Sequence, residues 1–163
     1  MSTCILSKDS FFIKGIAELL GEDFINESYV IVDLDCLRLS RDEVFSSKNK
    51  TIIGFASNDF SFYLAEKMKV DFILNKKSPI TDIIDFFLFR KNRALYHSQA
   101  TLTVREKQLL ELVCTGATPI DLARSLGVKT KTVYTFRRNV MIKLGCNNRI
   151  NLQQLWNGKT LGF

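Results

Sequence analysis

The chain has 163 residues, of which 46% are hydrophobic and 25% charged, as in one ordinary or two small folded domains rather than a disordered protein. No apolar run approaches the roughly 20 residues that span a bilayer. The N-terminus also lacks a basic region followed by an apolar run, so a cytoplasmic protein without a signal peptide is expected.

The positive charge is concentrated at one end of the chain. Residues 1–100 carry 13 Lys and Arg against 14 Asp and Glu, whereas residues 101–163 carry 10 Lys and Arg against 3 Asp and Glu. A basic surface can serve solubility alone. This uneven division nevertheless favours a polyanion-binding module attached to a nearly neutral one.

Short apolar strands alternate with helical patterns over the first part of the chain. Strands are predicted at residues 3–6, 29–34, 51–56 and 70–74, and helices at 11–20, 38–45, 60–68 and 79–93. The last helix is expected to bury a face made of Ile80, Ile83, Ile84, Phe87 and Leu88. The alternation predicts a short α/β domain at residues 1–92, with a parallel sheet covered on both faces, and then a linker at 93–101.

Only helical signals follow, so residues 102–163 are predicted to form an all-α domain of four helices. Thr103 and Glu106 have the spacing of a capping box for the first helix, which is expected to end at Gly116. Thr118 and Pro119 predict a second helix over 119–126, which buries Ile120, Leu122, Ala123 and Leu126 and ends at Gly127. A third helix is predicted over 131–144, and a fourth, capped by Asn147 or Asn148, continues through Leu152, Leu155 and Trp156.

The second and third of these helices, joined by a tight turn that contains glycine, predict a helix-turn-helix unit. At 100° per residue, Val133, Phe136, Val140 and Leu144 share the core side of the third helix, and Lys131, Tyr134, Thr135, Arg138 and Ile142 share the opposite side. This second face can place donors against base edges and phosphates in a major groove. An ordinary solvated face has the same pattern, and the turn, the caps and the charge are what favour DNA binding.

Neither a metal site nor a catalytic site is indicated. Cys4, Cys36, Cys114 and Cys146 lie too far apart for a CxxC motif, and His97 is the single histidine, so reduced thiols without zinc or another cofactor are expected. The chain has no GxGxxG or GxxxxGK[ST] motif and no cluster of His, Cys and Asp. The sequence therefore does not indicate an enzyme.

The C-terminal part resembles the LuxR-type output domain, also called NarL/FixJ or GerE-like. The similar residues are 102–106, Gly116, 120–128, 131–133, 139–145 and 148–149, within a segment of about 101–156. The resemblance implies that the third helix enters the major groove and that the fourth, with Leu152, Leu155 and Trp156, supports dimerisation. It implies base contacts at Tyr134, Thr135 and Arg138, and phosphate contacts near Lys131, Thr132 and Lys143.

Two positions depart from this family's pattern. Lys129 stands where the family commonly has a serine cap, which predicts that capping shifts to Thr130. Phe136 stands where the family often has histidine, which either changes groove contacts or adds to the core.

Residues 5–20, with Lys14-Gly15-Ile16, resemble the first strand and helix of a receiver domain that has lost its chemistry. A working receiver holds Mg²⁺ with carboxylates beside an acceptor Asp and uses a hydroxyl and a lysine on the phosphoryl group. In this chain Ser7 and Lys8 stand at the positions of the acidic pair. Phe55 stands at the position of the hydroxyl, and Asn75 at the position of the lysine. Asp33, with Asp35 nearby, is left as a degenerate phospho-acceptor, and a strand–helix pair is missing after the first helix.

The two-part organisation resembles small auxiliary regulators of enteric bacteria, some of which pair with a full-length response regulator. It predicts a sequence-specific DNA-binding transcription regulator that acts as a homodimer or heterodimer, independently of phosphorylation. The alternative is an interaction protein that modulates a response regulator by heterodimerisation with little base reading. Arg138 and Lys131 argue against the alternative, because such a protein needs neither.

Overall fold

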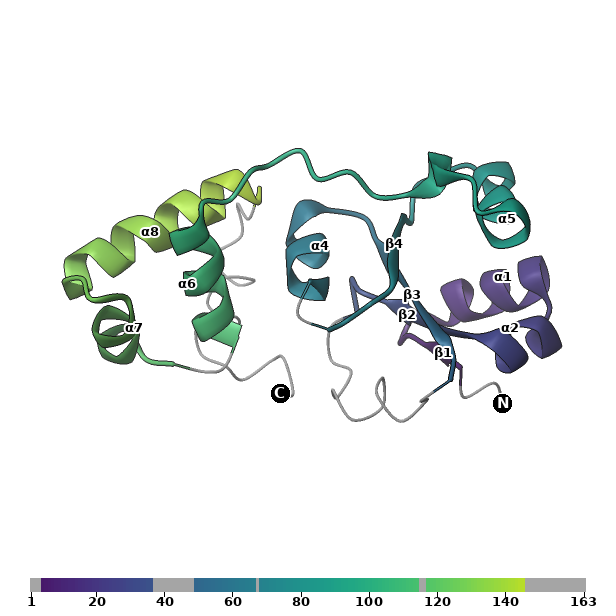
Figure 1. Cartoon of the computed structure of the whole chain (residues 1–163), viewed down its shortest axis with the longest axis horizontal. Helices are drawn as coiled ribbons and strands as arrows, with labels where there is room; N and C mark the ends of the chain where they lie inside the picture. The colour runs from purple at the N-terminus through teal and green to yellow at the C-terminus, as the bar shows by residue number, and fades with distance from the viewer. Residues whose placement is uncertain (1–3, 37–48, 67, 115–116, 146–163) are drawn as a thin grey trace. The chain divides into compact units, whose positions relative to one another are not determined.

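The computed structural model describes residues 4–36, 49–66, 68–114 and 117–145. The chain divides into two compact units, residues 1–98 and 99–163 (Figure 1). Within the described ranges no helix combines the length and apolar character that crossing a membrane requires.

The first unit is built on a parallel sheet. Its strands β1 (Ile5–Leu6), β2 (Tyr29–Asp33), β3 (Thr51–Ala56) and β4 (Phe72–Asn75) lie side by side in chain order. Doubly wound sheets commonly have the order 2-1-3-4-5, and removing the second strand leaves the order found here. The predicted parallel sheet is confirmed, and its order agrees with the predicted loss of a strand.

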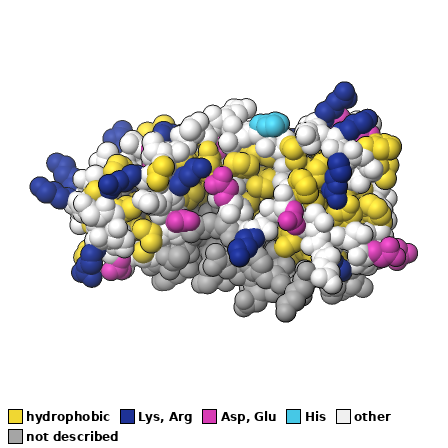
Figure 2. All heavy atoms as spheres, in the orientation of Figure 1, with side chains coloured by type: hydrophobic (Ala, Val, Ile, Leu, Met, Phe, Trp, Pro, Cys, Tyr) yellow, Lys and Arg dark blue, Asp and Glu magenta, His cyan; other side chains and the backbone are white. Residues whose placement is uncertain are grey.

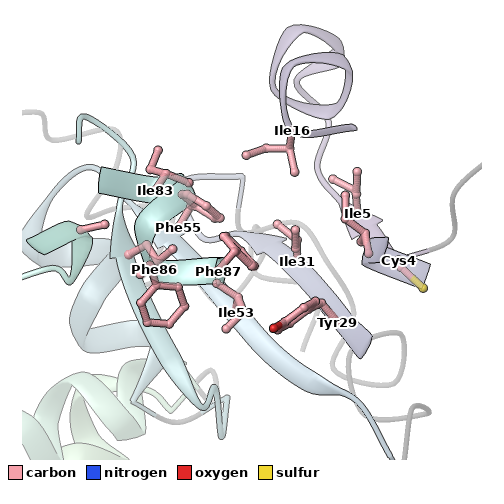
Figure 3. Close-up of a cluster of buried hydrophobic side chains, with 13 residues drawn as sticks. Cys4, Ile5, Ile16, Tyr29, Ile31, Ile53, Phe55, Ile83, Phe86 and Phe87 are labelled. Atoms are coloured by element: carbon pink, nitrogen blue, oxygen red, sulfur yellow. The ribbon is translucent and has the colours of Figure 1, made fainter. Parts of the chain in front are cut away.

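Helices cover both faces of this sheet, as predicted. α1 (Ser10–Leu20), α2 (Glu22–Ser28) and α5 (Ile80–Phe89) pack on the face that carries Ile31, Ile53 and Phe55 (Figures 1 and 3). α4 (Asp59–Ala65) and the residues after it pack on the other face, against Val30, Val32 and Ile52. The helix expected at 38–45 lies outside the described residues.

The two connections at the ends of the sheet have opposite hands. The chain steps from β1 to β2 and from β3 to β4 in the same direction, but through α1 and α2 on one face and α4 on the other. Crossovers that step the same way through opposite faces cannot both be right-handed, so one of them is of the rare left-handed kind.

Two features of the first unit differ from the sequence prediction. α2 was not expected, because Ile25 is its single buried residue and no apolar period marks it. On α5 the buried residues are Ile83, Phe86 and Phe87, whereas Ile80 and Leu88 are 62% and 61% exposed. α5 is apolar around most of its circumference, so the pattern alone does not select the face that packs.

The residues that follow α5 belong to the first unit. Asn92–Ala94 form a 3-10 helix, Leu95 bridges Leu74 at the edge of the sheet, and the Tyr96 N–H donates to the Ile73 carbonyl at 2.8 Å. Ala94 is fully buried. Part of the linker predicted at 93–101 therefore packs on the first unit, with Leu95 and Tyr96 at the β4 edge.

The second unit contains three described helices, α6 (Val104–Cys114), α7 (Pro119–Leu126) and α8 (Thr130–Lys143). Leu109 of α6, Leu122 of α7 and Val133 of α8 are almost completely buried and form the centre of this unit. The all-α prediction is confirmed for these three helices. The predicted fourth helix, the cap at Asn147 or Asn148, and Gly116 lie outside the described residues.

Candidate nucleic-acid interface

α7 and the turn after it are fixed by local hydrogen bonds. The Thr118 hydroxyl oxygen accepts from the Asp121 N–H at 3.2 Å, and the Asp121 carboxylate accepts in return from the Thr118 N–H and hydroxyl. Gly127 ends the helix with φ of 64°, a left-handed conformation that glycine adopts without strain. The predicted cap is thus confirmed and extends to a capping box. The predicted burial of Ile120 is wrong, since this first-turn side chain is 63% exposed.

α8 begins three residues after the αL glycine and has two distinct faces. Val133, Val140 and Leu144 are buried against the other helices of the unit. Lys131, Tyr134, Thr135 and Arg138 are exposed, and Thr132 is half-buried beside them. The face predicted for DNA contact is therefore the face that the unit leaves open, and Lys and Arg side chains lie on the surface of this unit in Figure 2.

The start of α8 corrects one prediction. Lys129 is the N-cap residue, makes no side-chain capping bond, and is followed by Thr130 as the first helical residue. Capping therefore does not shift to Thr130. Phe136 is half-buried, between the core and the open face.

An ion pair ties the C-terminal end of α8 to the first turn of α6. The Lys143 ammonium lies 2.7 Å from Glu106 Oε2, and the side chains are 37% and 6% exposed. Glu106 Oε2 also accepts from the Thr103 N–H at 2.8 Å, and the Glu106 N–H donates to the Thr103 hydroxyl, as the predicted capping box requires. Burial raises the pKa of Glu106, but the bonds from Lys143 and Thr103 outweigh it and hold the pKa below its usual range.

Lys143, predicted as a phosphate contact, thus has its ammonium on a buried carboxylate of its own unit, and the pair joins α8 to α6. Arg105 is engaged similarly, because its guanidinium donates to the Leu126 carbonyl at the end of α7 at 2.8 Å.

One half-buried side chain beside the open face, Arg137, was missed by sequence reasoning. The Arg137 guanidinium lies 5.7 Å from the ring centroid of Tyr134, one helical turn earlier. Such a cation–π contact restrains the tyrosine ring. The i, i+3 spacing of Tyr134 and Arg137 could have indicated it.

The degenerate receiver pocket is closed by an ion pair at the carboxyl ends of the strands. Asp33 is fully buried, and its Oδ2 accepts from the Ser7 hydroxyl at 2.7 Å and from the Lys76 ammonium at 2.9 Å. Asn75, the predicted position of the receiver lysine, is the last residue of β4, and the ammonium on Asp33 comes from the next residue, Lys76. Burial alone would lower the pKa of Lys76, but the bond to Asp33 and the negative charges of Asp33 and Asp35 together outweigh burial and raise this pKa, so the ammonium form is favoured.

Asp35 lies beside this pocket but is committed elsewhere. Its Oδ1 accepts from the Ser57 N–H at 3.1 Å and the Ser61 hydroxyl at 2.7 Å, and its Oδ2 lies 3.9 Å from the Lys76 ammonium. Within the described ranges no three His, Cys, Asp or Glu side chains are grouped to hold a metal ion. Cys4 and Cys36 carry free thiols.

The geometry of α7, the turn and α8 defines a helix-turn-helix unit. Residues 100–156 match the family described as bacterial regulatory proteins, luxR family, so this segment is a luxR-family regulatory domain, as the resemblance implied. Regulatory proteins, not enzymes, make up that family. The predicted dimer residues Leu152, Leu155 and Trp156 fall within the match but outside the described residues.

Two relatives from Escherichia coli (strain K12) share this segment. The transcriptional regulatory protein UhpA is 41% identical over 54 residues, which are 33% of this chain and 28% of UhpA. The uncharacterized response regulatory protein YgeK is 40% identical over 57 residues, 35% of this chain and 39% of YgeK. The match thus spans less than two fifths of either relative.

A solved structure resembles both units together. It is described as two RcsB dimers bound to two parallel DNAs, and it gives a TM-score of 0.50 and 16% identity over 96% of this chain and 97% of that one. At this identity the likeness shows the two-part fold.

Proposed function

We propose that this chain is a sequence-specific DNA-binding transcription regulator that acts as a dimer in the cytoplasm. The observation that carries the proposal is the open face of α8, where Lys131, Tyr134, Thr135 and Arg138 stand opposite a buried anchor of Val133 and Val140. In helix-turn-helix proteins such a face lies in the major groove. The resemblance between this fold and RcsB, whose described structure contains DNA, supports the assignment.

The proposed contacts divide by chemistry. Arg138 can donate two bonds to the O6 and N7 atoms of guanine, and Tyr134 and Thr135 can reach neighbouring base edges. Lys131 and Thr132, in the first turn of α8, are suited to phosphates, which fix the register of the helix. Lys143 is left out of this set because of its ion pair with Glu106.

We further propose that regulation does not depend on phosphorylation of Asp33. Its carboxylate is fully buried and bonded to Ser7 and Lys76, and Ser7 and Lys8 stand where the receiver resemblance requires an acidic pair. An acceptor Asp must be reachable and needs Mg²⁺ to neutralise the incoming phosphoryl group. The pocket offers neither access nor a second carboxylate at those positions.

Helix-turn-helix proteins commonly bind paired half-sites as dimers. This supports dimerisation of the chain, either with a second copy or with a full-length response regulator. We propose that Leu152, Leu155 and Trp156 contribute to it in the second unit, and that residues 97–101 link the two units.

The test is the salt dependence of binding to duplex DNA by the full chain, followed by fluorescence anisotropy. The plot of log K against log salt has a negative slope, and each lost phosphate contact makes this slope shallower by about 0.9. Lys131→Ala should flatten the slope by about that amount. The control is Lys77→Ala, which removes an exposed lysine of the first unit and should leave the slope unchanged. A native affinity that does not vary with salt would contradict the proposal.

A further inference from the structure

One residue on the open face of α8 has no part in the proposed contacts. Ile142 lies in the last turn of the helix, and its side chain is 66% exposed. It follows the fully buried Val133 by nine residues, which at 100° per residue places it on the opposite side of the helix. Ile142 therefore lies at the centre of the open face.

Polar residues share this central position. Lys131, Thr135 and Arg138 precede Ile142 by 11, 7 and 4 residues, so each lies within about 40° of it around the helix axis. All three side chains are exposed. Among these four described residues Ile142 alone is apolar, and the other three present hydrogen-bonding groups.

The position of Ile142 is what makes its exposure informative. A single exposed isoleucine elsewhere on a protein surface is ordinary. At the centre of a face that enters the major groove, the side chain loses water and gains no hydrogen bond, so it needs an apolar partner there. The positive charges of Lys131 and Arg138 beside it favour DNA as the molecule that supplies this partner.

The major groove offers a suitable apolar group. The edges of base pairs present hydrogen-bond donors and acceptors there and, at thymine, a C5 methyl group. Apolar side chains commonly contact this methyl group in protein–DNA complexes. The chemistry of Ile142 thus matches one base in particular.

We propose that Ile142 is a specificity-determining residue that contacts the C5 methyl group of a thymine. This inference rests on the proposed function and adds one feature to the DNA site. Ile142 lies one helical turn, about 6 Å along the axis, beyond Arg138, and successive base pairs are about 3.4 Å apart. The thymine therefore lies within about two base pairs of the guanine that Arg138 reads.

The experiment replaces the thymines of the DNA site by deoxyuridine, one at a time. The site is the motif that the native chain selects from random duplex DNA, and binding of the full chain is followed by fluorescence anisotropy. Uracil pairs with adenine and keeps the O4 acceptor of thymine, so each replacement removes only a methyl group. At one thymine, or at its symmetry mate, the native chain should bind about fourfold more weakly, the factor expected for one apolar carbon.

Ile142→Ala tests which residue reads this methyl group. The variant should bind the thymine and uracil duplexes equally at that position and respond like the native chain at every other thymine. Val104→Ala, which shortens a 73% exposed side chain of α6 in the same unit, is the matched control and should keep the native difference. In urea, Ile142→Ala should be no less stable than the native chain, because the side chain is exposed and alanine favours helices.

Three results would overturn the proposal. These are a motif in which no thymine responds to loss of its methyl group, an Ile142→Ala variant that keeps the native response at every thymine, and a loss of stability in that variant, which would show that the side chain packs within the chain. In each case a selected motif that still depends on Arg138 leaves the proposed function standing. A native chain that selects no motif would contradict the proposed function itself, and this inference with it.

Discussion

Replacing Lys143 by Met tests whether this lysine orients α8 or contacts DNA. The substitution keeps the aliphatic part of the side chain and removes the ammonium, which leaves the Glu106 carboxylate, 6% exposed, with the Thr103 N–H but without its cation. Breaking a fully buried pair costs about 3–5 kcal/mol. Lys143 is 37% exposed, so water can partly replace it, and we expect a loss of about 2 kcal/mol.

The assay is urea unfolding of the full chain, followed by the fluorescence of Trp156, the single tryptophan, which lies in the second unit. With a slope of about 1 kcal/mol per molar urea for so small a domain, the midpoint should fall by about 2 M. Adding Glu106→Gln should restore about half of the loss, because glutamine is neutral and still accepts from Thr103. The reasoning is refuted if Lys143→Met unfolds like the native chain and flattens the salt slope of DNA binding.

Four further outcomes follow from the described contacts. The pKa of Glu106 is lower in the folded protein than its ordinary value of 4.5, so its ionised form stabilises the fold above pH 4.5. This stability is lost as the pH falls through the lower pKa of the folded state. The stability of the second unit should therefore fall less steeply with acid in Glu106→Gln. Asp33→Asn should cost roughly 1–3 kcal/mol in urea unfolding of the first unit, because Lys76 loses its buried partner. Mass spectrometry of the native chain after treatment with acetyl phosphate should find no phosphoaspartate at Asp33. Thr118→Ala should cost about 1 kcal/mol, measured on the same tryptophan signal, because the α7 capping box is lost.

The three described helices of the second unit could be predicted closely from the sequence. Its signals are local: Thr103 with Glu106, Thr118 with Pro119, and Gly127 each act within one helical turn, and the structure places them as caps. What could not be predicted was the partner of Lys143, because Glu106 is 37 residues away in the chain. A lysine on a basic helix indicates a DNA contact when the distant carboxylate with which it forms an ion pair is not known.

The first unit was harder because its decisive contacts join distant segments. The strands could be predicted, but Lys76 joins Asp33 across 43 residues, and this lysine directly follows Asn75, where β4 ends. On α5 the composition gives two apolar faces, and only the position of the helix on the sheet decides which one packs.

The central claim is that the open face of α8 reads base sequence, and selection from random duplex DNA tests it most directly. The full chain should enrich one motif from the pool. Arg138→Ala should lose preference at one base position, at a cost of roughly 1–3 kcal/mol on the preferred site, while its unfolding stays native because the side chain is exposed. Arg93→Ala, which removes an exposed arginine of the first unit, should select the native motif. Failure of the native chain to enrich any motif, or an unchanged motif from Arg138→Ala, would contradict the account and favour a protein that acts by pairing with a response regulator.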